Sequence, residues 1–112
     1  MQMSSSRFDR TQVVLVKESR IDAASAIAFK DKVRDLTQGG AETVVLDLKQ
    51  VDFIDSSGLG AIVATMKQMA GTQTLQLAAL RPNVDKVFRL TRMDSIFKIH
   101  DSAEKAVESH AD

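Results

Sequence analysis

The stretch VVLDLKQVDFIDSSGLGAIVATMKQM, residues 44–69, changes from one apolar pattern to another at its centre. TVVLDL (43–48) is a nearly continuous apolar run, which is typical of a central strand covered on both faces of a sheet. After DSSG (55–58) the apolar residues recur at helical spacing, which predicts a helix over 57–70 that ends near Gly71. The residues of this apolar stripe are Leu59, Ile62, Val63, Met66 and Met69.

The same alternation of strand and helix patterns extends in both directions from this stretch. Pro82 suits the first turn of a helix whose inner face carries Val84, Val87 and Phe88. Strand, helix, strand, helix, strand implies parallel pairing with right-handed crossovers. The sequence therefore predicts an α/β fold, a mixed sheet of four or five strands with about four helices. The remaining expected elements are strands at 11–17, 74–80 and 95–99 and helices at 23–38 and 102–110, with Asp22 and Ser102 as N-caps and Gly39 and Gly40 as a helix stop.

The ends of the chain are harder to assign. SRFDR (6–10) predicts a short strand that turns back on the next one. We expect residues 1–6 and 110–112 to be frayed, as termini often are. With no repeat and no linker, the 112 residues predict a single domain.

Composition excludes several classes of protein. Fifteen basic residues balance fifteen acidic ones, and Trp and Tyr are absent, so the sequence lacks the basic excess and stacking aromatics of a nucleic-acid binder. No apolar run is long enough to span a bilayer, and the N-terminus lacks the apolar segment of a signal peptide. The absence of cysteine rules out disulfides and thiolate metal sites and fits the cytoplasm.

The DSSG segment lies where a central strand ends and a helix begins, the edge at which α/β sheets collect ligands and reactive groups. Taken alone, Ser56 or Ser57 could simply cap the helix. Gly58 and Gly60 lack a Cβ, which would let another backbone or a phosphate come close. The residues by themselves leave open whether a serine is a cap or a chemical target.

No complete catalytic set can be read from the sequence. Asp47, Asp52 and Asp55 could suggest a metal or phospho-aspartate site, but the acidic pair that a receiver domain carries after its first strand is missing. IDSSG (54–58) has Ile54 where a nucleophile elbow needs glycine. We expect His100 and His110 at a helix end or on the surface. The sequence thus predicts no catalytic residue, no metal site and no cofactor.

Several motifs together resemble the STAS family, named for sulfate transporters and anti-sigma factor antagonists, in its small single-domain bacterial form. DSSGLG (55–60) follows an apolar strand and a short loop and precedes an amphipathic helix. RIDAASAIAFKDKV (20–33) resembles the family's early acidic turn and first helix, with Ile21 and Asp22 at its Leu/Ile-Asp pair. NVDKVFRLTRMDSIFKIHDSAEKAV (83–107) resembles its closing segment. The resemblance implies one STAS-like domain.

The resemblance also implies a partner switch. The unphosphorylated antagonist would bind a serine kinase that acts as an anti-sigma factor and would free its effector. Phosphorylation of Ser56 would release the kinase, and a PP2C-type phosphatase would restore the serine. Asp22, Asp55, Ser57, Gly58, Leu59 and Gly60 would form the switch loop and partner surface, with Ser57 shaping the loop or capping the helix. The protein would be a substrate rather than an enzyme, a monomer when free, and not inserted in a membrane.

The resemblance leaves a second function open. A STAS protein can also be a non-switching accessory subunit of a larger complex such as a lipid transporter. The intact serine doublet favours the switch. Ser19 and Arg20 replace the Gly and Glu that usually precede the family's Leu/Ile-Asp pair, which bears on the choice of partner.

Overall fold

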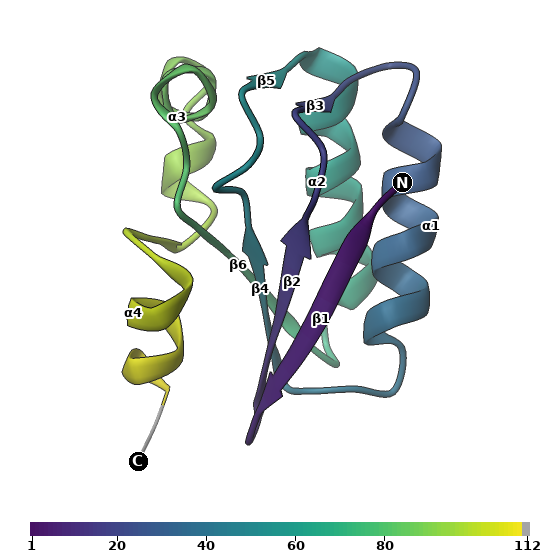
Figure 1. The fold of residues 1–112 in the computed structure, drawn as a ribbon, viewed down its shortest axis with the longest axis vertical. Coiled ribbons are helices and arrows are strands. Elements are labelled where there is room, and N and C mark those ends of the chain that lie inside the picture. Colours follow the sequence, from purple (N-terminus) through teal and green to yellow (C-terminus); the bar gives the residue numbers. More distant parts are fainter. Residues whose placement is uncertain (111–112) are drawn as a thin grey trace.

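The protein is a five-stranded mixed sheet with helices against it, seen in a computed structural model that describes residues 1–110 (Figure 1). The sheet has the order β1-β2-β4-β6-β7. β1 pairs with β2 antiparallel, and the other neighbours are parallel. The strands are β1 (Met3–Phe8), β2 (Thr11–Val16), β4 (Thr43–Asp47), β6 (Thr74–Ala78) and β7 (Ile99–His100). The predicted α/β fold with 43–48 at its centre is confirmed.

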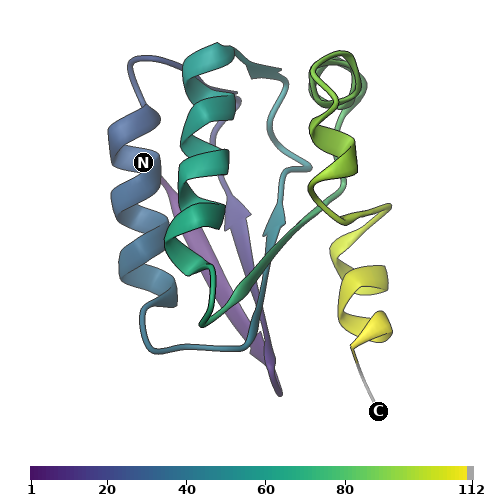
Figure 2. The same ribbon diagram turned by 180° about the vertical axis from the view of Figure 1, so that it is seen from behind.

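Two long helices cover one face of the sheet. α1 (Ala26–Thr37) and α2 (Ser56–Met69) lie side by side behind the strands in Figure 1 and in front of them in Figure 2. Their buried residues, such as Phe29, Val33 and Ile62, join the main core with the strand residues that point the same way. Apolar burial on this face is the principal stabilising term of the fold.

The shorter helices lie elsewhere. α3 (Pro82–Leu90) begins at proline, as predicted, and α4 (Ala103–Ser109) is capped by Ser102, whose Oγ accepts the Lys105 N–H at 3.1 Å. Ala103 and Ala106 of α4 pack on the opposite sheet face. Figure 1 shows no helix in front of β1 and β2, so this face is only partly covered.

A second, two-stranded parallel sheet was not predicted. β3 (Arg20–Ile21) pairs with β5 (Phe53–Ile54), with Arg20 beside Phe53 and Ile21 beside Ile54. Two-residue strands are too short to give a period in the sequence. They bring the loop before α1 next to the loop before α2.

The expectation of a frayed N-terminus is wrong for residues 3–6. They belong to β1, which is longer than the short strand expected near 6–10 and pairs with β2 along its whole length. The backbone ladder holds this polar segment, which apolar periodicity could not reveal. At the other end, His110 is hydrogen-bonded to Gln76, and the expectation for 111–112 lies outside the described residues.

Two other expectations need correction. The strand expected at 95–99 is a 3₁₀ turn at Met93–Ser95 followed by the two-residue β7, because the chain must turn after α3 before it reaches the sheet. Asp22 does not cap α1; the helix begins later, with Ser25 at the N-cap position.

Within residues 1–110, the structure has no helix long and apolar enough to cross a membrane.

Candidate functional site: the start of helix α2

Asp55, not a serine, caps helix α2. Its Oδ1 accepts the Gly58 N–H at 2.8 Å, and its own carbonyl accepts the Leu59 N–H at 2.9 Å. Of the two roles expected for Ser57, capping the helix is therefore wrong, and shaping the loop stays a prediction. The carboxylate takes this role because it stands one residue before the first helical turn, in extended backbone, as N-cap residues do.

Asp55 also links the two loops. Its Oδ2 accepts the Ala23 N–H at 3.1 Å, so one carboxylate holds the helix start and the β3–α1 loop together. Asp55, which was expected in the switch loop, thus fixes the position of that loop within the fold. A negative charge at a helix N-terminus is also favourable electrostatically.

Ser56 and Ser57 are the first two residues of α2, and both are exposed. Neither hydroxyl makes a hydrogen bond to any of residues 1–110. Both serines therefore present a hydroxyl to the solvent rather than to the fold.

Gly58 is required by a close backbone approach. A Cβ at this position would lie 2.1 Å from the Ile21 carbonyl oxygen and 3.0 Å from Ile54 Cγ1. Ile21 belongs to β3, so the glycine lets α2 start directly against the small sheet. The expectation of a close approach is confirmed at Gly58. At Gly60 no other part of the fold comes close, so the expectation is wrong there: the residue is exposed, and a Cβ would meet nothing within 4 Å.

Leu59 differs from the two serines in its burial. It is half-buried and packs against the main core. Leu59 therefore anchors the first turn of α2 to the core, which explains part of its role in the motif.

Asp22 lies in a small network beside this site. Its Oδ2 is 3.2 Å from Arg20 Nε, and its Oδ1 accepts a hydrogen bond from Ser25 Oγ at 3.2 Å. The hydrogen bond from Arg20 is the main reason that the pKa of the Asp22 carboxyl lies below its usual value. Asp22 thus shapes the loop that Asp55 holds, which brings the two predicted acids to one end of the molecule.

Arg20 and Phe53 were missed as site residues. The Arg20 guanidinium carbon lies 4.2 Å from the centre of the Phe53 ring, and both side chains are exposed. Since they belong to paired strands, only the β3–β5 register brings them together. Nothing in the local sequence indicates this contact.

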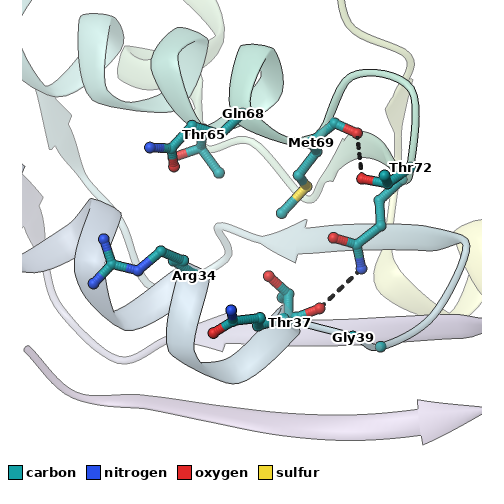
Figure 3. Close-up of a pocket in the computed structure, with 10 residues that line it drawn as sticks. Arg34, Thr37, Gly39, Thr65, Gln68, Met69 and Thr72 are labelled. Carbon is teal, nitrogen blue, oxygen red and sulfur yellow. Dashed lines mark hydrogen bonds between the residues drawn. The ribbon is translucent and has the colours of Figure 1, made fainter.

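A cavity lies at the other end of these helices. It measures about 430 Å³ and lies between the C-terminal ends of α1 and α2 (Figure 3). Its polar groups already hold the helix ends: Thr72 Oγ1 donates to the Met69 carbonyl and Gln73 Nε2 to the Thr37 carbonyl. Within residues 1–110 no group of three or more His, Cys, Asp or Glu side chains could hold a metal ion.

Comparison with known proteins gives the family. The model of the STAS domain matches residues 5–106, which is most of the chain. The chain belongs to the STAS domain family. DSSGLG (55–60) lies within the matched residues, at the start of α2.

Named relatives lie within this family. BtrV of Bordetella bronchiseptica, named as a candidate anti-sigma factor antagonist, is 33% identical over 77% of this chain and 75% of its own. The anti-sigma-B factor antagonist of Bacillus subtilis is 32% identical over 79% of this chain and 81% of its own. A crystal structure of a candidate anti-sigma factor antagonist from Thermotoga maritima superimposes with a TM-score of 0.82 at 29% identity, covering 96% of this chain and 92% of that one.

Proposed function

We propose that this STAS protein is an anti-sigma factor antagonist that is switched by phosphorylation of Ser56. The observation that carries the proposal is the exposed hydroxyl of Ser56, directly after the capping Asp55, in the DSSGLG motif of a STAS domain. The names of relatives such as the B. subtilis antagonist support the same role. The protein acts as a regulator and kinase substrate, not as an enzyme.

The surface around Ser56 suits a protein partner. Phe53 and Ile27 are exposed apolar residues on β5 and on the first turn of α1, the elements next to the Asp55-linked loops. Gly60 leaves the exposed side of α2 open to close approach. Aromatic and aliphatic side chains ringed by polar groups are typical of protein interfaces. The partner is a serine kinase that also acts as an anti-sigma factor, and the setting is the cytoplasm.

Phosphorylation would oppose binding through charge. A phosphate adds about −1.5 to −2 charges near neutral pH. One unit charge repelled by another at roughly 6 Å, with an effective dielectric near 20, costs about 2.8 kcal/mol, or roughly a hundredfold in affinity. Asp55 already places a negative charge beside Ser56, and this charge adds to the field around the new phosphate, whereas the charge of Asp22 is largely offset by its ion pair with Arg20.

The proposal is tested with variants used as affinity baits. Ser56→Ala should retain a kinase from native lysate, and Ser56→Asp should bind it at least about tenfold more weakly. The captured kinase, once purified, should phosphorylate the wild-type protein with ATP, and site-resolved mass spectrometry should find phosphate on Ser56. A PP2C-type phosphatase should remove it.

Ser57→Ala is the matched control, because its hydroxyl is also exposed one residue away and it should still be phosphorylated. Phosphate on Ser57 alone would contradict the proposal. Equal binding of the Ser56→Ala and Ser56→Asp variants to one stable assembly would favour a non-switching accessory subunit instead.

A further inference from the structure

The groove between β1, β2 and α4 contains a buried acid that the proposed function does not use. It has a volume of about 360 Å³. It lies on the sheet face opposite α1 and α2, which α4 covers only in part (Figure 1). Its lining residues are Ser4, Ser6, Phe8, Val13, Leu15, Asp47, Ala103, Glu104 and Val107.

The strand register places Asp47 in the floor of this groove. Ser4 pairs with Leu15, and Leu15 pairs with Asp47, so these three side chains form one row across β1, β2 and β4. Val13 and Val45 lie one pleat further along on the same face and pack with Ala103 and Ala106 of α4. The acid therefore belongs to an otherwise largely apolar surface.

The Asp47 carboxylate is only partly satisfied by the fold. The residue is 4% exposed, and its Oδ1 accepts the Lys49 N–H at 3.1 Å. Its Oδ2 makes no hydrogen bond or ion pair with residues 1–110, and it is not sealed from solvent. This oxygen therefore faces the groove without a protein partner and is free to accept a hydrogen bond from a cation.

The remainder of the lining defines what kind of cation fits. Phe8, 48% exposed, and the half-buried Leu15 and Val107 offer apolar walls. Glu104 adds a second carboxylate at the rim, and no Lys or Arg lines the groove. Pockets of a few hundred Å³ suit small molecules with an apolar body and a few polar groups.

We propose that this groove binds a small amphiphilic amine, whose ammonium group contacts Asp47 while its apolar body lies against Phe8, Leu15 and Val107. The ammonium donates to Oδ2, and Glu104 adds attraction at the rim. Charge complementarity selects the cation, and the apolar walls select against fully polar amines.

The test is a titration of the ¹⁵N-labelled full-length protein, followed by amide chemical shifts. 2-Phenylethylamine is the ligand, and 2-phenylethanol and 3-phenylpropanoate are its neutral and anionic controls. The amine should cause saturable shifts at residues of the groove and should bind at least about tenfold more tightly than either control. Equal affinities for the three compounds, or shifts centred elsewhere, would overturn the proposal.

The Asp47→Asn variant tests the acid itself. Asparagine keeps an oxygen for the Lys49 N–H, so the loop should hold while amine affinity falls at least about tenfold. Asp31→Asn, at an exposed carboxylate on α1, is the matched control and should bind like the wild type. Unchanged amine affinity in a folded Asp47→Asn variant would refute the assignment.

A second variant keeps the test valid if Asp47→Asn does not fold. Val107→Lys places a tethered ammonium in the groove from the surface of α4 and should weaken amine binding about tenfold. Glu108→Lys, at an exposed position on the same helix that does not line the groove, should not weaken it.

A further probe distinguishes a protein partner from a small molecule. Nα-acetyl-lysine amide stands in for the lysine side chain of a protein partner. Tighter binding of this probe than of 2-phenylethylamine would overturn the small-molecule proposal.

Discussion

Two glycines in one motif have opposite physical roles. Gly58→Ala should destabilise the protein by at least about 3 kcal/mol, because its Cβ would collide with the Ile21 carbonyl and neither backbone can move freely. Gly60→Ala is the matched control and should stabilise it by about 1 kcal/mol, since it is exposed in a helix with open space around it. Urea denaturation measures both. A Gly58→Ala protein as stable as the wild type would contradict the close approach.

The cap of α2 can be assigned by the same measurement. Asp55→Ala should cost about 1 kcal/mol because it removes the acceptor of the Gly58 N–H. Ser57→Ala should change stability by less than about 0.5 kcal/mol, as is usual for an exposed side chain that bonds nothing. The reverse order of effects would restore Ser57 as the cap.

At the scale of elements, the end of α4 is held by an unusual pair of contacts. His100 Nε2 on β7 lies 2.7 Å from Gln76 Oε1, and His110 Nε2, at the C-cap of α4, lies 2.9 Å from the same oxygen. Because an amide oxygen only accepts, both Nε2 atoms donate. The expectation of helix-end or surface positions for these histidines is only partly right, since both are half-buried and bonded to a buried glutamine.

These contacts predict a pH dependence of stability. Burial, followed by the nearby charges of Lys98 and His110, holds the pKa of His100 below its usual value of 6.5. As the pH falls through about 6.5, the unfolded chain takes up the proton before the folded one, so stability is lost. The melting temperature should therefore fall between about pH 7.5 and pH 5. In His100→Gln this fall should be smaller, and an identical fall would exclude His100 as the cause.

At the scale of the whole molecule, β1 protects the sheet. β2 is almost entirely buried, and β1 covers its edge with a polar sequence, MSSSRF. Apolar strands with open edges are prone to pair with other chains. Removal of residues 1–8 should therefore lower stability and cause association. Light scattering after size exclusion should detect oligomers of the truncated protein, while the full-length protein is expected to run as a monomer. A truncated protein that remains a stable monomer would contradict this role.

The local sequence was sufficient for the layout of the main sheet. The apolar run of β4 and the stripe from Leu59 to Met69 are each contained in one short segment, so their periods predicted a central strand and the helix after it. Pro82 and Ser102 likewise act on the turn next to them, and both predictions held. Such features depend on residues that are adjacent in the sequence, so they can be predicted from the sequence alone.

What only the tertiary structure decided depends on residues far apart in the chain. The sequence placed Asp55, Ser56 and Gly58 in one motif, but it could not show that Asp55 reaches Ala23 or that Gly58 meets Ile21. Nor could it predict β1, whose pairing rests on backbone hydrogen bonds rather than on apolar side chains. From the sequence, Asp47 was one of three acids that could suggest a metal or phospho-aspartate site. Its place in an open groove follows from the register of three strands and the position of α4. Composition and the spacing of apolar residues determine local structure, whereas packing determines which residues far apart in the sequence come into contact.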